Sequence, residues 1–126
     1  MITLYGIKNC DSVKKARLWL AQNALDYTFH DFRAQGLAPA LLDTWLHEIG
    51  WERLLNRRGT TWRELSEASK AEVDGNAARG LMLAHPTLIK RPVLALESVH
   101  LVGFADATYR EFFSQHGKLT GTKQER

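Results

Sequence analysis

The stretch ITLYGIKNCDSVKKARLWL (residues 2–20) is the most informative about the fold. Its pattern predicts a strand, then a cysteine, then a helix. Residues 2–5 are mostly apolar and β-forming, so we expect a buried strand there. Asp11 or Ser12 can cap the N-terminus of a helix, since both side chains accept hydrogen bonds from free helix N–H groups. The only cysteine of the chain, Cys10, is therefore expected at the junction of strand and helix.

The next segments complete a β-α-β unit. The helix is expected to run to about Asn23, with Val13, Ala16 and Leu20 along one apolar face. Residues 27–32 alternate aromatic and polar side chains, which is typical of a second strand. Two parallel strands joined by a helix require a right-handed crossover.

The middle of the chain changes from strand patterns to helix patterns. In residues 39–85 apolar side chains recur at helical spacing, and breaks fall near Gly50, Gly59 and Gly75. This pattern predicts three to five short helices and no strand. We interpret the segment as an all-helical insert, about residues 36–85, within one α/β domain, because the flanking strands need each other to form a sheet.

The pattern returns to strands after the insert. Residues 93–97 and 99–102 are two short apolar runs, and so short a joint between them makes an antiparallel hairpin. Asp106 can cap a last helix, whose apolar side is formed by aromatic residues such as Tyr109. The order β-α-β, helices, β-β-α is that of an α/β thioredoxin-like fold with a helical insert.

The length and charge of the chain fit one compact domain. Its 126 residues, 44% of them hydrophobic, suffice for a core, and we expect a single domain over residues 1–116 and a flexible basic tail, residues 117–126. The tail carries three basic side chains and one acidic side chain, or +2 of the net charge of +3, which leaves +1 for the remainder. We therefore expect no direct binding of nucleic acid.

The sequence also argues against a membrane protein, a secreted protein and a metal-binding protein. The N-terminus lacks the regions of a signal peptide, and no apolar run reaches the ~18 residues of a membrane helix. One cysteine allows no internal disulfide and fits a reducing compartment. The five histidines show no ligand spacing. We therefore expect a cytoplasmic protein without a metal, and a monomer is the default expectation.

Cys10 has the surroundings of a reactive thiol. A helix N-terminus presents free N–H groups and partial positive charge, and both stabilise a thiolate. Lys8, Lys14 and Lys15 are near in sequence and act in the same direction. The alternative is a buried, inert cysteine, but the polar residues next to Cys10 favour a partly exposed nucleophile. Ser12 can hydrogen-bond the thiolate or cap the helix, and we favour capping.

The chain contains no second thiol to complete a redox pair. A cysteine at position 13 could form an internal disulfide with Cys10, but Val13 is there instead. Any catalytic cycle must therefore use an external thiol, such as glutathione, a glutaredoxin or a second copy of the protein.

A pair of arginines in LLNRRGTTW (residues 54–62) is a candidate anion site. Arg57 and Arg58 can bind an anion through charge-assisted hydrogen bonds. Taken alone, however, this motif is better interpreted as a solvated basic turn.

The segment HPTLIKRPVL (residues 85–94) places Arg91 before a proline that opens a strand. Such a proline often marks only a strand boundary. In a thioredoxin-like fold, Pro92 would instead be the cis-proline whose loop faces the thiol. That arrangement would place Arg91 beside Cys10.

With Cys10, LLNRR and PTLIKRPVL taken together, residues 1–115 resemble the ArsC/Spx family, in particular its YffB-like branch of arsenate-reductase-like proteins. The cysteine at the strand–helix junction and the IKRPV segment are the most specific features of the resemblance. It implies a thioredoxin-like fold with a helical insert, a bacterial, cytoplasmic setting and a nucleophilic Cys10.

The resemblance also limits the chemistry. In the glutaredoxin-coupled arsenate reductases of this family, His-Asn-Pro leads up to the cysteine and three arginines hold the oxyanion, whereas here GIKN precedes the cysteine. Arg91 matches one of these arginines. The other two positions fall on Asn56, for which Arg57 or Arg58 can stand in, and on Gly103.

The function that remains is thiol chemistry with an external thiol. We predict a glutathione-dependent thiol–disulfide reductase, in which Cys10 attacks an oxidised thiol substrate, such as a protein, and glutathione or a glutaredoxin resolves the mixed disulfide. One alternative is a non-enzymatic, protein-binding regulator of the Spx type, although Val13 removes the Cys-x-x-Cys switch that many Spx proteins carry. Another is an arsenate reductase coupled to glutathione and glutaredoxin. The residues expected to bind substrate or glutathione are Lys8, Asn9, Ser12, Arg57, Arg58, Arg91 and Pro92.

Overall fold

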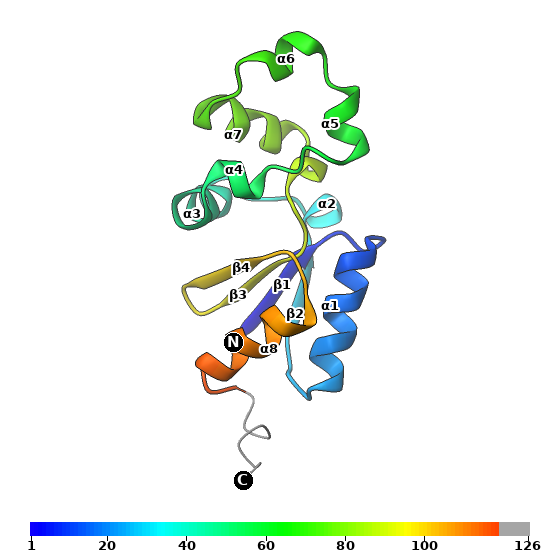
Figure 1. Cartoon of the computed structure of the whole chain (residues 1–126), viewed down its shortest axis with the longest axis vertical. Helices are drawn as coiled ribbons and strands as arrows, with labels where there is room; N and C mark the ends of the chain where they lie inside the picture. Colours follow the sequence, from blue (N-terminus) through cyan, green and yellow to red (C-terminus); the bar gives the residue numbers. More distant parts are fainter. Residues whose placement is uncertain (119–126) are drawn as a thin grey trace.

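A computed structural model describes residues 1–118 of the chain (Figure 1). The strands are β1 (Ile2–Gly6), β2 (Thr28–Asp31), β3 (Val93–Leu96) and β4 (Val99–Val102). The helices are α1 (Asp11–Gln22), α2 (Phe32–Gln35), α3 (Pro39–Ile49), α4 (Trp51–Leu54), α5 (Thr60–Glu64), α6 (Glu67–Ala71), α7 (Gly75–Ala84), the 3-10 helix η1 (Pro86–Leu88) and α8 (Asp106–Gln115). The tail predicted over residues 117–126 lies almost entirely outside the described residues.

The strands form one mixed sheet in the order β2-β1-β3-β4. β1 and β2 are parallel, and β3 runs antiparallel to both β1 and β4. α1 makes the crossover between β1 and β2, and a two-residue turn of Glu97 and Ser98 joins the β3–β4 hairpin. This is an α/β thioredoxin-like fold with a helical insert, so the predicted fold is confirmed.

One face of the sheet is covered by α1 and α8 (Figure 1). Alternate side chains of β1 and β3 point to this face, because side chains alternate across a strand. The buried residues of this layer are Ile2, Leu4, Val13, Ala16, Trp19, Leu20, Leu94, Leu96, Tyr109, Phe112 and Phe113. Trp19 stacks on Phe113 with ring centres 5.6 Å apart, and it meets Tyr109 edge-on at 5.5 Å. The aromatic side chains predicted for the last helix therefore form part of the hydrophobic core.

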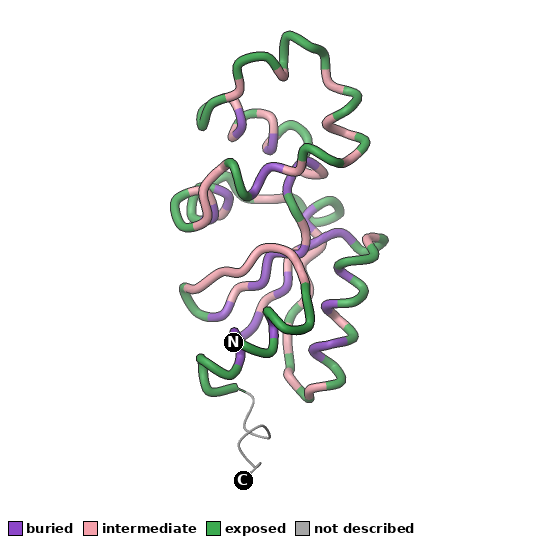
Figure 2. The backbone as a smooth tube through the Cα atoms, viewed as in Figure 1, coloured by how far each residue is buried: buried purple, intermediate pink, exposed green. Residues whose placement is uncertain are grey.

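The helical insert builds a second core on the other side of the sheet. Five α-helices, α3 to α7, lie between residues 39 and 85, in agreement with the predicted number. The buried residues here are Ile7, Phe32, Leu42, Trp45, Leu54, Leu55, Ala78, Met82, Leu88, Ile89 and Val93. Trp45 of α3 meets Tyr5 of β1 edge-on, with ring centres 5.0 Å apart. Figure 2 shows buried segments of β1 and β3 between the helices on the two sides.

The insert begins earlier than predicted, because Asp31 ends the second strand and starts a helix. The Asp31 carboxylate accepts hydrogen bonds from the N–H groups of Arg33 and Ala34, which caps α2. The strand predicted over residues 27–32 therefore stops at Asp31, and helix starts at Phe32 rather than near residue 36.

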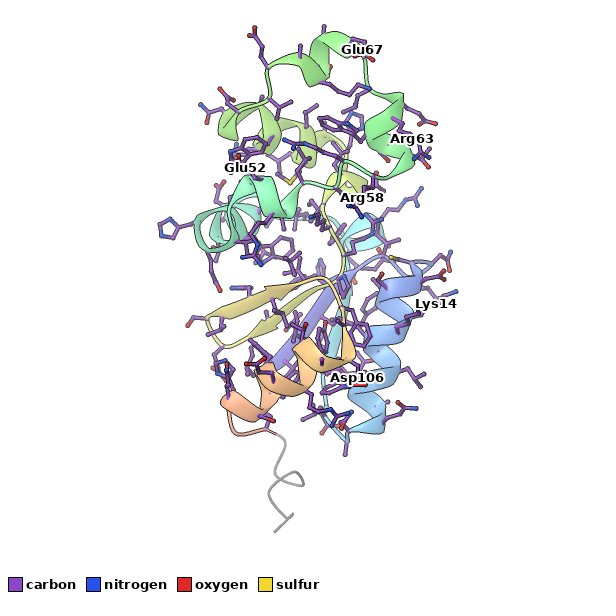
Figure 3. The ribbon with its side chains drawn as sticks, in the orientation of Figure 1. Lys14, Glu52, Arg58, Arg63, Glu67 and Asp106 are labelled. Carbon is purple, nitrogen blue, oxygen red and sulfur yellow. The ribbon has the colours of Figure 1, made fainter. Side chains whose placement is uncertain are left out.

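The cap predicted for the last helix was wrong. The N-cap of α8 is Ala105, and Asp106 is the first helical residue. The Asp106 carboxylate instead accepts a hydrogen bond from the Trp19 Nε1 at 3.1 Å, which ties α8 to α1. Figure 3 shows Asp106 at the end of α8 that lies beside α1.

Gly6 allows β1 and α1 to approach closely, which gives a stability prediction. A Cβ atom at Gly6 would lie only 2.6 Å from the Val13 Cγ2. Gly6→Ala should therefore lower the free energy of unfolding by about 1–3 kcal/mol, measured by urea denaturation. The double variant Gly6→Ala/Val13→Ala should be less destabilised than the sum of the single variants, because the shorter side chain removes the clash.

A matched control is available in Gly80→Ala. Gly80 lies in α7, and no atom beyond its chain neighbours and the backbone of its own helix is within 4 Å of the position that its Cβ would occupy. This variant should gain about 0.5–1 kcal/mol through helix propensity. An unfolding midpoint of Gly6→Ala equal to that of the wild type would contradict the close approach.

Candidate active site

The loop before Cys10 is held by the end of β2. After β1 the chain turns over residues 7–9, and the Cys10 N–H donates a hydrogen bond to the Ile7 carbonyl at 3.3 Å. The Lys8 N–H donates to the Asp31 carboxylate at 3.1 Å. The carboxylate that caps α2 therefore also fixes the turn that presents the cysteine.

Cys10 itself is the N-cap residue of α1. Its backbone is extended, and its carbonyl accepts a hydrogen bond from the Lys14 N–H at 2.9 Å. The prediction that Asp11 or Ser12 caps this helix was wrong, because both residues already lie in its first turn. The Cys10 residue is half-buried.

The peptide bond between Arg91 and Pro92 is cis, as the sequence predicted. Pro92 leads directly into β3, and Val93 is paired with the end of β1. The Pro92 carbonyl accepts a hydrogen bond from the Gly103 N–H at 2.8 Å. The cis-proline loop thus lies between the end of β4 and the turn that carries Cys10.

The Arg91 guanidinium is fixed by main-chain carbonyls. Its Nη1 donates hydrogen bonds to the carbonyls of Thr87 at 2.8 Å and Ile89 at 3.1 Å. Arg91 and Cys10 line the same cavity, and the arginine lowers the pKa of the thiol. The structure therefore places Arg91 beside Cys10, where the sequence placed it.

The cavity at Cys10 has a volume of about 240 Å³. It gathers segments from the start of α1, the loop after α4, the cis-proline loop and the end of β4. The residues that line it are Cys10, Ser12, Asn56, Lys90, Arg91 and Gly103. Asn56 and Gly103, which the sequence resemblance aligned with two arginines of the arsenate reductases, bring no charge to this cavity.

The pKa of the Cys10 thiol reflects two opposed effects. Partial burial raises the pKa, because it disfavours the charged thiolate. Hydrogen bonding from the Val13 N–H, a hydrogen bond and the charge of Arg91, and the Ser12 N–H act in the opposite direction. These effects prevail, so the pKa of Cys10 lies below its ordinary value and the nucleophilic thiolate is favoured.

The charge that lowers the pKa of Cys10 comes from a residue distant in sequence. Arg91 supplies it, whereas the sequence assigned this effect to Lys8, Lys14 and Lys15. All three lysines are exposed, and Figure 3 shows Lys14 on the outer side of α1. Exposed charges are screened by water and salt, whereas Arg91 lies next to the sulfur.

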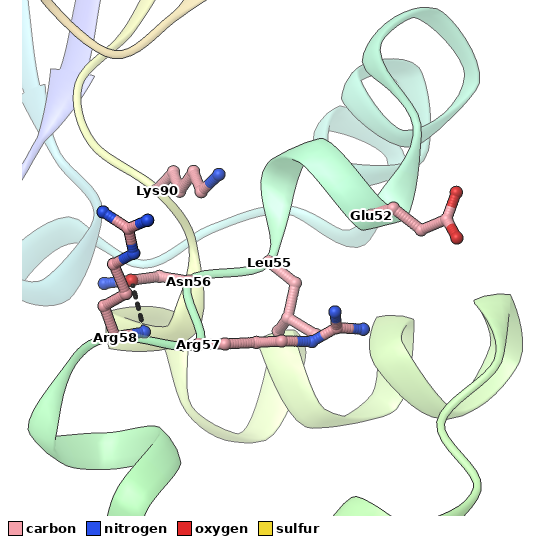
Figure 4. Close-up of a pocket in the computed structure, with 6 residues that line it drawn as sticks. All are labelled: Glu52, Leu55, Asn56, Arg57, Arg58 and Lys90. Atoms are coloured by element: carbon pink, nitrogen blue, oxygen red, sulfur yellow. Dashed lines mark hydrogen bonds between the residues drawn. The ribbon is translucent and has the colours of Figure 1, made fainter.

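A second cavity, of about 320 Å³, adjoins the first (Figure 4). The residues that line it are Glu52, Leu55, Asn56, Arg57, Arg58 and Lys90. Main-chain hydrogen bonds join its two walls: the Asn56 N–H donates to the Leu88 carbonyl at 2.7 Å, and the Lys90 N–H donates to the Leu54 carbonyl at 2.8 Å. Asn56 and Lys90 therefore line both cavities.

The remaining predicted site residues lie farther from the thiol. Arg57 and Arg58 line the second cavity and are not among the residues that line the first. Lys8 and Asn9 are exposed on the turn before Cys10 and line neither cavity. Their predicted role in binding stays a prediction.

Three residues of the Cys10 cavity were missed as site residues. Lys90 directly precedes Arg91 in the segment HPTLIKRPVL. Its position next to a predicted site residue could therefore have identified it. Asn56 and Gly103 were signalled only by their alignment with family arginines. Nothing in the local pattern shows that these residues meet.

Within residues 1–118, no group of three or more histidine, cysteine, aspartate or glutamate side chains could hold a metal ion. None of the helices in this described part has the length and apolar composition needed to cross a bilayer.

The chain belongs to the ArsC family, whose sequence profile matches residues 5–112. An uncharacterized protein of Haemophilus influenzae is 43% identical over 114 residues, which cover 90% of this chain and 100% of that protein. The global transcriptional regulator Spx 2 of Bacillus anthracis is 29% identical over 114 residues, which cover 89% of this chain and 86% of the regulator.

Solved structures show the same relationship. A protein named YFFB superposes with a TM-score of 0.84 at 50% identity, covering 88% of this chain and 97% of that chain. An arsenate reductase (ArsC) related protein from Brucella melitensis superposes with a TM-score of 0.74 at 51% identity, covering 89% and 93%. These similarities confirm the predicted ArsC/Spx family and its YffB-like branch.

Arg91→Met should raise the pKa of Cys10. Without the guanidinium, the effect of burial would be opposed only by the Val13 and Ser12 N–H groups. The rate of alkylation by iodoacetamide follows the thiolate fraction, so its rise with pH should move to higher pH in the variant. In the wild type, the midpoint should lie below that of free cysteine in the same buffer.

Lys14→Met provides the matched control for this measurement. It removes an exposed positive charge close to Cys10 in sequence, and its alkylation profile should coincide with that of the wild type. An Arg91→Met profile with an unchanged midpoint, or an equal displacement in both variants, would show that Arg91 does not set the pKa.

Proposed function

We propose that the protein is a glutathione-dependent thiol–disulfide reductase with Cys10 as its single nucleophile. The observation that carries the proposal is the site of this thiol, which is half-buried at a helix N-terminus, opens onto a cavity and has a lowered pKa beside Arg91. A catalytic thiol needs both ionisation and access. Membership of the ArsC family and the similarity to an arsenate reductase related protein support reduction through a thiol.

The reaction proceeds by three exchanges at sulfur. The Cys10 thiolate attacks a substrate disulfide, whose S–S bond breaks as a mixed disulfide forms and one substrate thiolate leaves. A glutathione thiolate attacks the Cys10 sulfur and releases the second substrate thiolate, which leaves glutathione bound to Cys10. A second glutathione attacks the sulfur of the bound one, which yields glutathione disulfide and free Cys10 thiolate. Two electrons pass from two glutathiones to the substrate, and the released thiolates take protons from water.

The residues around Cys10 favour both the first and the last of these exchanges. In the first exchange, the lowered pKa increases the fraction of Cys10 that is a nucleophilic thiolate. In the last exchange, Cys10 is the leaving group, and a thiol of lower pKa leaves faster. Arg91 is held by main-chain carbonyls and needs no rearrangement to stabilise this charge. Val13 is buried where a resolving cysteine would stand, so the second thiol is external.

Arsenate reduction is less well supported by the site. Of the three arginines that the family resemblance associates with the oxyanion, Arg91 alone lines the Cys10 cavity. Asn56 and Gly103 occupy the other two positions, and Arg57 and Arg58 line the adjoining cavity. An arsenate ion at Cys10 would therefore receive few charge-assisted hydrogen bonds.

A protein-binding regulator is the second candidate function. The similarity to the Spx 2 regulator of Bacillus anthracis, at 29% identity over 89% of this chain, favours it. Binding of that kind does not require a thiolate at position 10, since no cysteine pair is present to act as a switch. The chemistry of Cys10 therefore separates the two candidates.

Cys10→Ser should abolish the reduction of hydroxyethyl disulfide by glutathione, because a serine hydroxyl does not attack a disulfide. Formation of glutathione disulfide can be followed through NADPH consumption by added glutathione reductase. Wild-type protein incubated with glutathione disulfide should gain the mass of one glutathione, located at Cys10 by mass spectrometry of its peptides. The serine variant should gain none.

Two outcomes would count against the reductase. One is a wild-type protein whose Cys10 forms no disulfide with glutathione while a protein partner binds Cys10→Ser and wild type equally, which would favour the regulator. The other is consumption of glutathione that depends on arsenate and not on a disulfide substrate, which would favour an arsenate reductase.

A further inference from the structure

The second cavity is joined to the Cys10 cavity through two lining residues. It shares Asn56 and Lys90 with the Cys10 cavity, and at about 320 Å³ it is larger than the 240 Å³ around the thiol. The main-chain hydrogen bonds between the Asn56 and Lys90 segments hold both walls in place. A small thiol whose sulfur reaches Cys10 therefore has room for its remaining atoms in this second cavity.

Positive charge dominates the second cavity. Arg57, Arg58 and Lys90 contribute three positive charges, and Glu52 contributes one negative charge. Among the ion pairs of residues 1–118, none involves any of these four side chains. Their charges are therefore available to a ligand, and the excess of positive charge favours a carboxylate.

Arg57 and Arg58 are held in different ways. The Arg57 guanidinium lies 5.5 Å from the ring centre of Trp51 and 5.7 Å from that of Trp62, so cation–π contacts connect it to α4 and α5. The Arg58 N–H donates to the Asn56 Oδ1 at 3.0 Å. Figure 4 shows the two arginine side chains leaving the turn in different directions, with that of Arg58 alongside Asn56. Arg57 is thus bound to the insert itself, and Arg58 remains free to contact a ligand.

We propose that the second cavity binds a carboxylate of the thiol that resolves Cys10, with Arg58 and Lys90 as binding residues and Arg57 as a positioning residue. The proposal rests on the proposed function and narrows its co-substrate to small thiols that carry a carboxylate several bonds from the sulfur, glutathione among them. A guanidinium, an ammonium and the Asn56 amide can all donate hydrogen bonds to a carboxylate. Binding there would hold the attacking sulfur at the Cys10 disulfide, which accelerates exchange by proximity.

The test uses a disulfide of Cys10 that carries no charge of its own. Treatment with 2,2′-dithiodipyridine joins a thiopyridyl group to Cys10, and attack of a thiol on the Cys10 sulfur releases 2-thiopyridone, which is followed by absorbance. Release by glutathione should saturate with concentration, and release by neutral 2-mercaptoethanol should stay linear. Arg58→Met and Lys90→Met should each lower the second-order rate constant for glutathione on the order of tenfold. Arg58→Met should leave that for 2-mercaptoethanol unchanged, and Lys90→Met should lower it less than that for glutathione, because Lys90 also lines the Cys10 cavity.

Three further variants separate binding from general effects of charge. Arg53→Met removes an exposed arginine of α4 that does not line the cavity, and it should leave both rate constants unchanged. Arg57→Met should lower the glutathione rate and change the tryptophan fluorescence, because Trp51 and Trp62 lose their cation. Arg57→Lys should restore both towards the wild type. Urea denaturation of each variant establishes that it is folded.

The outcomes separate this proposal from the proposed function. An equal loss of rate with both thiols in Arg58→Met and Lys90→Met would overturn the carboxylate site, since the effect would then lie at Cys10. Linear release by glutathione in the wild type would overturn it as well, and both results leave the reductase intact. A wild-type Cys10 that reacts with neither dithiodipyridine nor glutathione disulfide would overturn the proposed function and this inference with it.

Discussion

The antiparallel pairing of β3 with β1 is the contact on which the rest of the structure depends. Its register places Leu94 opposite Leu4 and Val93 opposite Tyr5 at the end of β1. The cis-proline loop before Val93 therefore meets the turn that follows β1 and carries Cys10. A slip of one residue would turn Leu94 away from α1 and α8 and would move the loop along the strand. The core and the site are thus specified by one register.

Burial and hydrogen bonding have opposite effects on the pKa of the Cys10 thiol. Burial excludes water and by itself would raise the pKa of Cys10. The helix N-terminus and Arg91 reverse this effect, and each comes from a different part of the fold. The helix supplies N–H groups through local geometry, whereas Arg91 depends on strand pairing and on its bonds to the carbonyls of Thr87 and Ile89. Such a site combines access with a stabilised negative charge on the sulfur.

The helical insert completes the site rather than simply enlarging the molecule. Leu55 forms an isolated β-bridge with Ile89, and the flanking hydrogen bonds fasten the loop after α4 to the segment before Pro92. Glu48 of α3 also binds His100 of β4, through the imidazole Nδ1 at 2.6 Å and the main-chain N–H at 2.8 Å. The insert is therefore fixed to the sheet at two places. These contacts position the cations of the insert next to the cavity of the thiol.

Most of the strands and helices, and the kind of chemistry, could be predicted from the sequence alone. The strand and helix periods, the hairpin and the cysteine at the junction are local features, and local features can be predicted from short windows of residues. Arg91 could be placed beside Cys10 only because the element order identified the fold and its cis-proline loop. Tertiary structure decided that Cys10 is the N-cap, that Arg91 rather than the nearby lysines acts on the sulfur, and that Asn56 and Lys90 join two cavities. These contacts depend on strand register and on packing between distant segments, and neither is encoded in any single stretch of the chain.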